Sequence, residues 1–401
     1  MSGIAALAIG YVLSQFYRSF LAVLTPVLTT ELGASKADLS EASGAFFICF
    51  ALSQFAIGVS LDRFGPRRTA GVMLAVCGGG GAFLFAMATE PWMVTVAMGL
   101  IGIGCGPVLM AALFIFARIY LPARFSVLAS WMVAFGTAGN VIGASPLANA
   151  SEAFGWRPVM VALGIVTVLT AAAVLVLVRD PAKAEDGQGS GGGFSGYLEL
   201  LCLRKLWPVI PLMAIAYAPS AGIRGLWAGP YMADVYSADT LLIGDVTFFM
   251  ALSMVAGAFI YGPLDQIFRS RKWVAVAGNL VSLAAIAYLA INPLTTVTTA
   301  TVVLVLIGIS GGCYGLLMAH ARAFLPAHLT GRGVTLMNFF SVGGVGVMQF
   351  ATGSVFTANM GPNGEVAAYG ALFAFYAAAV FIALFIYLFA RDAKPGRGVS
   401  A

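Results

Sequence analysis

Charge is scarce in this chain of 401 residues. Charged residues make up 9% of it, against roughly 25% in an ordinary soluble domain, while hydrophobic residues make up 60%. The five cysteines are dispersed and contain no C-x-x-C pair, so we expect them to pack as small apolar residues. This composition excludes an ordinary soluble domain and predicts a membrane protein in contact with the lipid bilayer.

Long polar stretches are almost absent as well. A helix that crosses the hydrocarbon core needs about 20 apolar residues, and the sequence divides into twelve such stretches. They lie near residues 4–30, 42–61, 69–89, 93–116, 127–150, 158–178, 207–233, 243–264, 273–291, 298–319, 333–357 and 367–390. We therefore expect an all-α membrane protein with twelve transmembrane helices. The first stretch has no cleavage site after it and is expected to be a retained helix.

Basic residues are nearly absent from one side of the predicted membrane. The polar segments between the predicted spans can be assigned alternately to the two sides of the membrane. On this assignment 17 basic residues lie on the side of both termini, and only Lys36 and Arg157 lie on the other. The positive-inside rule therefore predicts a multi-pass protein of the cell inner (plasma) membrane with both termini in the cytoplasm. Because this distribution accounts for the net charge of +5, we expect no binding to nucleic acid.

The second half of the sequence repeats features of the first. Five short matches occur in the same order at nearly constant spacing, which is hard to obtain by chance. The matches pair Leu61-Asp62 with Leu264-Asp265, residues 100–103 with 306–309, Ala117-Arg118 with Ala321-Arg322, Arg179-Asp180 with Arg391-Asp392, and the Tyr11, Ser14, Arg18 triplet with Tyr217, Ser220, Arg224. We therefore expect two six-helix bundles, residues 1–178 and 207–390, with a cytoplasmic glycine-rich linker (179–206) and a cytoplasmic tail (391–401).

The break between the second and third stretches carries a family motif. Residues 58–68 read Gly-Val-Ser-Leu-Asp-Arg-Phe-Gly-Pro-Arg-Arg. This segment resembles the signature loop of the major facilitator superfamily, G-x-x-x-D-R-x-G-x-[RK]-[RK], and residues 262–272 resemble a degraded second copy. With the twelve spans and the duplication, the resemblance covers the whole chain. It implies a transporter without a cofactor, whose two pseudo-symmetric bundles surround a central cavity and rock about a substrate site.

The resemblance also implies gating residues. In that family the loop aspartate pairs with helix ends and basic groups across the cytoplasmic gate. The alternative is that the arginines only anchor the loop at the anionic leaflet or only set the topology. The expected gating residues are Asp62, Arg63, Gly65, Arg67, Arg68, Asp265, Arg118 and Arg322.

Two arginines, Arg18 and Arg224, lie deep inside the first and seventh stretches. Each ends a triplet of tyrosine, serine and arginine that steps by three and then four residues, so each triplet lines one face of its helix. A charge at the bilayer centre costs roughly 2.5 to 3.5 kcal/mol on insertion scales, so these arginines need a function or a partner. The expected substrate-binding residues on these faces are Tyr11, Ser14, Gln15, Arg18, Tyr217, Ser220, Arg224, Trp227 and Tyr231.

Carboxylates are missing from the middle of the predicted membrane, because all 16 acidic residues fall near its two surfaces. A cavity with two guanidinium groups and no acid attracts an anion. We therefore expect a small organic anion as the substrate, a carboxylate or a phosphate ester, moved by exchange. The arginine pair resembles, in position only, that of the organophosphate:phosphate antiporters of the superfamily. The alternative is that each arginine bonds backbone carbonyls of a broken helix.

Other functions stay open at this point. His320 is a candidate proton carrier for a symporter of another small solute, and Met250, Met254, Met318 and His320 are candidate ligands of a copper importer. A transporter-like membrane sensor is a further alternative. We expect a monomer with no resident metal. An enzyme is not expected, because no nucleophile, base and orienting group come together at membrane depth.

Overall fold

The computed structural model of the protein describes residues 2–119, 128, 131–181, 195–326, 329–361 and 364–393, and every regular element within them is a helix. Helices satisfy their own backbone hydrogen bonds, which lipid cannot do. The first helices are α1 (Ser2–Phe16), α2 (Leu21–Leu32), α3 (Lys36–Met73), η1 (Leu74–Gly79), α4 (Gly80–Ala86), α5 (Pro91–Ile119), α7 (Ala138–Ile142), α8 (Ser145–Phe154) and α9 (Trp156–Leu177). They are followed by α10 (Ser195–Leu201), α11 (Ile210–Ile215), α12 (Ala218–Gly222), η2 (Ile223–Trp227), α13 (Ala228–Tyr236), α14 (Thr240–Ile267), α15 (Arg271–Ile291), α16 (Val297–Ser310), α17 (Cys313–Arg322), α18 (Thr330–Ala358) and α19 (Gly364–Tyr387).

Most of the predicted spans are continuous helices. In the described residues nine helices are long and apolar enough to cross a membrane, and the bent pair α1 and α2 makes a tenth passage. The predicted spans 127–150 and 207–233 are broken into shorter helices, the first into Trp131–Ile142 and α8, the second into α11, α12, η2 and α13. The twelve-span architecture is confirmed. The breaks were not predicted, because hydropathy records how apolar a segment is and not whether its helix is continuous.

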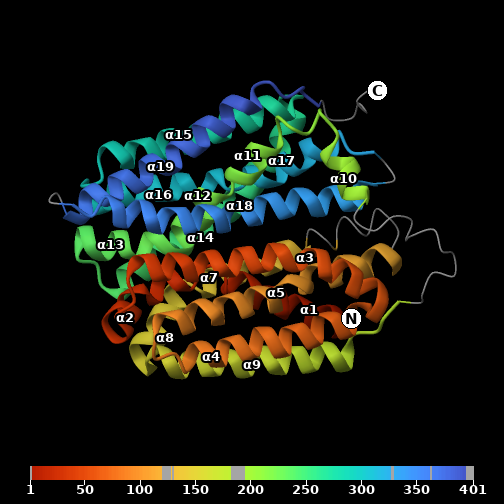
Figure 1. Cartoon of the computed structure of the whole chain (residues 1–401), viewed down its shortest axis with the longest axis horizontal. Helices are drawn as coiled ribbons and strands as arrows, with labels where there is room; N and C mark the ends of the chain where they lie inside the picture. The colour runs from red at the N-terminus through yellow and green to blue at the C-terminus, as the bar shows by residue number, and fades with distance from the viewer. Residues whose placement is uncertain are drawn as a thin grey trace.

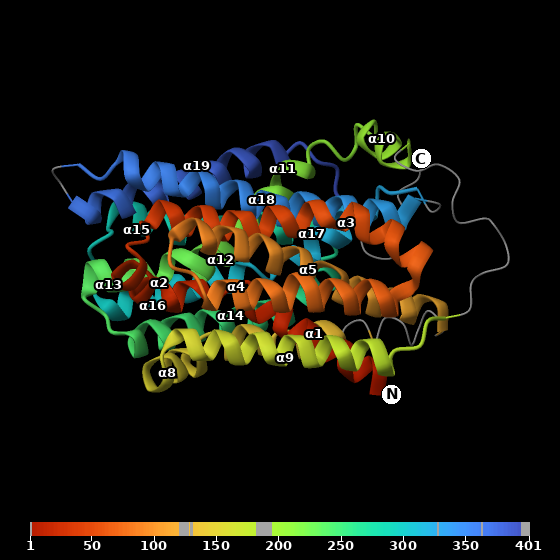
Figure 2. The same ribbon diagram turned by 60° about the horizontal axis from the view of Figure 1, so that its bottom comes forward.

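The helices form two layers, which we call the first half and the second half. Helices α1 to α9 (red to yellow) make one layer and α11 to α19 (green to blue) the other (Figure 1). Both views place the start of α1 and the end of α19 at one end of the molecule, which we call the terminal end. Helices α2 and α13 lie at the opposite end, the distal end (Figure 2).

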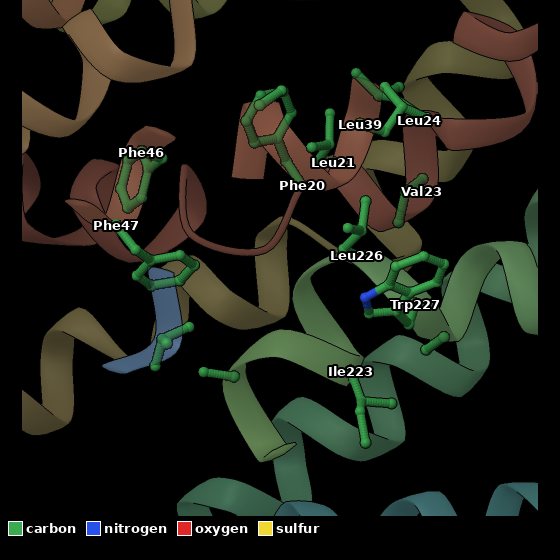
Figure 3. Close-up of a cluster of buried hydrophobic side chains, with 14 of the residues drawn as sticks. Phe20, Leu21, Val23, Leu24, Leu39, Phe46, Phe47, Ile223, Leu226 and Trp227 are labelled. Atoms are coloured by element: carbon green, nitrogen blue, oxygen red, sulfur yellow. The ribbon is translucent and has the colours of Figure 1, made fainter. Parts of the chain in front are cut away.

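The two halves share a hydrophobic core only toward the distal end. Phe20 and Leu24 of the first half and Ile223 and Trp227 of the second belong to one buried cluster (Figure 3). Toward the terminal end each half has a cluster of its own, one drawn from residues 6–178 and the other from residues 200–390. In the described part of the chain the shared core therefore lies toward the distal end. Toward the terminal end the halves have separate cores and touch through contacts such as that of Phe55 in α3 with Phe339 in α18, whose ring centres are 5.0 Å apart.

Glycines bring the two halves into backbone contact at the distal junction. A Cβ atom on Gly225 would stand 2.8 Å from the Arg18 carbonyl oxygen, and a Cβ on Gly229 would overlap the Ala22 carbonyl oxygen. Small residues let membrane helices approach this closely. The first and seventh of the twelve membrane spans, which we call passages, therefore meet directly beside Arg18.

Candidate functional site

Both intramembrane arginines lie where their helices are irregular. Arg18 falls in the four-residue turn between α1 and α2, whose axes differ by 52°. Arg224 lies in η2, a π-helical turn. Breaks and π-turns in membrane helices re-aim side chains and often mark binding sites. The two arginines thus project from the most irregular segments of their passages.

Arg224 is bonded across the two halves. Its side chain is buried, with 2% exposed, and Nη2 donates to Oδ1 of Asn140 in α7 at 2.9 Å. Its Nε has no hydrogen-bond partner in the described structure. The sequence does not predict this bond, because the pairing of Asn140 with Arg224 depends on how the two halves approach each other.

Arg18 has no comparable polar partner in the described residues. Its guanidinium carbon lies 4.5 Å from the centre of the Phe50 ring in α3, a cation–π contact, and its Nε is buried and unpaired. The turn that carries Arg18 also touches the passage that carries Arg224, because a Cβ on Gly225 would stand 2.8 Å from the Arg18 carbonyl oxygen. Among the ion pairs formed by described residues, none joins either arginine to a carboxylate.

Unpaired polar atoms concentrate among the predicted site residues. Eight buried side-chain N and O atoms of the described chain lack a hydrogen-bond partner, and four of them are Ser14 Oγ, Gln15 Oε1, Arg18 Nε and Arg224 Nε. Leaving such an atom unpaired costs roughly 1–3 kcal/mol, so most buried polar atoms in proteins are paired. Four of them belong to two adjoining passages, so these passages carry buried hydrogen-bonding groups that the described protein does not use.

The tyrosines of the two triplets contact other polar or aromatic side chains. Tyr11 accepts a hydrogen bond from Gln15 Nε2 at 3.1 Å, and Tyr217 packs on Tyr314 with ring centres 5.6 Å apart. Tyr314 also donates to Asn338 Oδ1 at 2.8 Å. We did not predict Tyr314 from the sequence. Its one local signal is the glycine-rich run of residues 311–315.

Three predicted site residues bond within the second half. Ser220 donates to the carbonyl of Tyr217 at 3.2 Å, in its own passage. Trp227 donates to Thr352 at 3.0 Å, and Tyr231 donates to the Pro293 carbonyl at 2.7 Å. Trp227 and Tyr231 are fully buried in the shared distal core. The structure therefore places them next to the site as packing residues, with their polar atoms already used.

One cavity lies between α3 and α18, and it holds about 300 Å³. Its lining is apolar and includes none of the predicted site residues. The lining residues are Ile48, Ala51, Leu52, Ala214, Ile215, Phe339, Phe340, Gly343, Gly344 and Val347.

The motif loop forms a sharp kink inside α3. Gly65 has φ 82°, and a Cβ there would lie 2.6 Å from the carboxyl carbon of Asp180. The Asp180 carboxylate accepts from the Arg67 backbone N–H at 2.8 Å, and the Arg67 side chain donates to the Leu175 carbonyl. These contacts stay within the first half. The Asp62 side chain lies outside the described part of the chain.

The second copy repeats this arrangement with other residues. Arg269 takes the position of Gly65 and has φ 51°. The Asp392 carboxylate accepts from the Ser270 hydroxyl at 2.6 Å and from the Lys272 N–H at 3.0 Å. Burial raises the pKa of Asp392, but these hydrogen bonds outweigh it and hold the pKa below its usual value. Asp180 and Asp392, which the sequence showed as a repeat without a role, thus cap the third and ninth passages.

The remaining gating candidates lie at the terminal end. Asp265 is bonded to Arg271, with Nε and Oδ2 3.2 Å apart. The guanidinium carbon of Arg63 lies 5.4 Å from the centre of the Phe64 ring, and that of Arg118 lies 4.2 Å from the Phe114 ring. The other two candidates, Arg68 and Arg322, are exposed.

His320 and Met318 share α17 at the terminal end, far from Met250 among the candidate copper ligands. His320 is fully buried, with Nδ1 2.6 Å from the Tyr387 hydroxyl and Nε2 2.9 Å from the Arg391 carbonyl oxygen. Met250 belongs to the shared distal core, whereas Met318 packs on the cluster of the second half at the terminal end. In the described residues no group of three or more His, Cys, Asp or Glu is placed to hold a metal. The candidate copper ligands are therefore not assembled into one site.

Comparison with known proteins gives a consistent family. A family model described as Major Facilitator Superfamily matches residues 7–348. Membrane sensor protein UhpC of Salmonella typhimurium (strain LT2) is 24% identical over 308 residues, which cover 69% of this chain and 68% of that protein. UhpC of Escherichia coli (strain K12) is 25% identical over the same shares.

Solved structures share the fold over almost the whole chain. Nucleoside transporter NupG has a TM-score of 0.76 and 13% identity, covering 98% of this chain and 100% of that one. A D-xylose-proton symporter gives 0.76 and 14%, covering 97% and 98%. A bacterial homolog of the human lysosomal transporter Spinster, in an inward-facing and occupied conformation, gives 0.74 and 19%, covering 96% of each chain. The family model covers most of the chain, so the chain belongs to the Major Facilitator Superfamily and not to an enzyme family.

Proposed function

We propose that the chain transports a small organic anion, a carboxylate or a phosphate ester, by alternating access. Arg18 and Arg224 then bind the anionic group from opposite halves. The observation that carries the proposal is the pair of buried, unpaired Nε atoms on two arginines that no described carboxylate neutralises. A guanidinium offers a planar fork of N–H donors that matches carboxylate and phosphate oxygens, and such charge-assisted bonds are roughly twice as strong as neutral ones.

The packing supports a form that is closed at the distal end. The halves share a core there, and Ser145 of the first half donates to Asp245 of the second at 2.8 Å. If both termini face the cytoplasm of a cell whose inner membrane holds the protein, this form opens inward. An anion held by both arginines relieves their mutual repulsion and draws the halves together, so occupancy favours the rocking motion. We assign residues 1–178 and 207–390 to the moving bodies, with gating at residues 62–68 and 265–272.

Exchange is the simplest coupling for this site. Moving one negative charge into a cell that is negative inside is opposed by roughly 2.3 kcal/mol per 100 mV. Exchange of one anion for another removes that opposition without a coupled proton. One chain supplies both arginines, so the proposed carrier works as a monomer.

Anion uptake into proteoliposomes tests the proposal. The purified protein is screened by thermal shift against carboxylates and phosphate esters, and the best stabiliser is then measured as a radiolabelled substrate. Arg18→Lys and Arg224→Lys each keep the charge but lose the fork, and we expect each to weaken binding about 10-fold or more. Arg157→Lys, at the distal surface, is the matched control and leaves uptake unchanged. Wild-type uptake in either arginine variant would reject the site.

A sensor is the second candidate, because both curated relatives named above are membrane sensor proteins. A sensor binds the anion with the same two arginines but moves none of it across the membrane. Stabilisation by an anion without uptake or exchange in proteoliposomes favours the sensor. Stabilisation together with uptake favours the transporter.

A further inference from the structure

The bond between Arg224 and Asn140 joins the two halves at the centre of the proposed site. Asn140 belongs to the first half and is 6% exposed, and Arg224 belongs to the second and is 2% exposed. The 2.9 Å distance from Nη2 to Oδ1 is ordinary for a hydrogen bond. A neutral amide oxygen thus occupies one of the five N–H donors of this guanidinium.

Asn140 is held rigidly against the first passage. The turns around Thr137 and Gly143 break its span on both sides of α7. Gly139 lies against the Val12 carbonyl so closely that a Cβ would overlap it, and a Cβ on Gly143 would lie 3.2 Å from Ser19 Oγ. Asn140 therefore moves with the first half, and its bond to Arg224 stretches or breaks whenever the halves rock.

We propose that Asn140 is a stand-in for the substrate: in the empty protein its amide oxygen takes the position on Arg224 that an anionic oxygen takes in the loaded protein. This inference rests on the proposed function. The amide satisfies one donor but leaves the positive charge uncompensated. A carboxylate or phosphate oxygen compensates that charge and forms the stronger bond, so it displaces the amide. Asn140 is then a positioning residue, which holds Arg224 ready and releases it on binding.

A carboxylate fixed at this position tests the exchange. Asn140→Asp places a tethered anion on Arg224, which competes with any free anion, so we expect binding to weaken about 100-fold or more. Asn140→Leu has a similar size but neither charge nor acceptor, and we expect binding within about threefold of the wild type or tighter. Asn279→Asp is the control, because Asn279 is equally buried in α15 but donates only to the Ala275 carbonyl in its own helix. Asn279→Asp adds the same charge away from Arg224, so we expect its affinity for the anion to stay within about threefold of that of the wild type.

The measurement is the dissociation constant of the stabilising anion, from thermal shift on protein that elutes as a single species. Equal affinities of Asn140→Asp and the wild type overturn the inference. A loss of more than 10-fold in Asn140→Leu also overturns it, because the amide would then contact the substrate instead of yielding to it. If Asn140→Asp does not fold, Asn140→Leu alone decides. Failure of the proposed function looks different, since Arg224→Lys would then bind as the wild type does.

Discussion

Lys36 of the first half is bonded to Glu365 of the second, with Nζ and Oε1 2.8 Å apart at the distal end. The same ammonium pairs with Asp234 at the end of the seventh passage. It also lies 5.2 Å from the centre of the Phe356 ring and 5.9 Å from that of Tyr369. Lys36 is one of two basic residues predicted for this side of the membrane. The four partners named here all belong to the second half.

Removing Lys36 should loosen the distal closure. Its side chain is 15% exposed, so its ion pairs are neither fully exposed nor fully buried. We therefore expect the loss of both pairs to destabilise the closed form by about 1–2 kcal/mol, between the values for surface and buried ion pairs. We expect Lys36→Met to speed the reaction of a cysteine introduced at Ala148, which is fully buried against Gly244 of the second half, with an impermeant thiol reagent by about 5- to 30-fold. Arg157→Met is the control, because Arg157 donates to the Ala86 and Ala88 carbonyls of its own half. Equal rates in the two variants argue against a role in closure.

The kink at Gly65 should not accept a side chain. Alanine there combines an unfavourable positive φ with a clash against the Asp180 carboxylate, and we expect Gly65→Ala to destabilise by roughly 1–3 kcal/mol. Gly58→Ala is the matched control in the same helix, where a Cβ meets nothing within 4 Å. Thermal unfolding in detergent compares the two. Similar melting temperatures would show that the kink adapts.

Asp392 should make the second half sensitive to acid. Its folded pKa lies below the usual value, so it stabilises the fold above the unfolded pKa, and this contribution disappears as the pH falls through the folded value. We expect the wild type to melt higher than Asp392→Asn at neutral pH. The difference in melting temperature should shrink as the pH falls below about 4, the usual pKa of an aspartate, and should vanish below the folded pKa. A gap that stays constant on acidification contradicts the capping role.

His320 should prove structural. Both imidazole nitrogens lie within hydrogen-bond distance of partners in the terminal end of the second half. We expect His320→Gln to lower the melting temperature and to leave the pH profile of uptake unchanged, because the ring is not free to exchange a proton with solvent. Tyr387→Phe removes one of the two partners and should lower stability in the same direction. Loss of pH dependence in His320→Gln would instead support the proton-carrier hypothesis.

The location of the arginines could be predicted from the sequence, because depth in a membrane follows from counting residues along the chain. The pairing of Arg224 with Asn140 could not, since it depends on two broken passages meeting in space. The breaks at residues 17–20 and in η2 are equally hidden, because neither segment contains a proline, the residue that most clearly marks an interrupted helix. For Trp227 and Tyr231, helical spacing predicted the correct neighbourhood. It could not show that both polar atoms already have partners.

The caps on the third and ninth passages illustrate the same limit. The repeat of Asp180 as Asp392 was visible in the sequence, and the repeat of their role depends on the sixth passage lying beside the third. Duplication predicts that equivalent residues have the same role. The role itself, here the capping of a helix, is seen only in the packed structure.

Gly225 and Gly229 leave no side chain between the first and seventh passages where they meet. Any residue larger than glycine at Gly229 would therefore act as a wedge at this junction. Such a variant would hold the distal end open without a ligand. It would therefore allow the structure of the conformation that is open at the distal end to be determined.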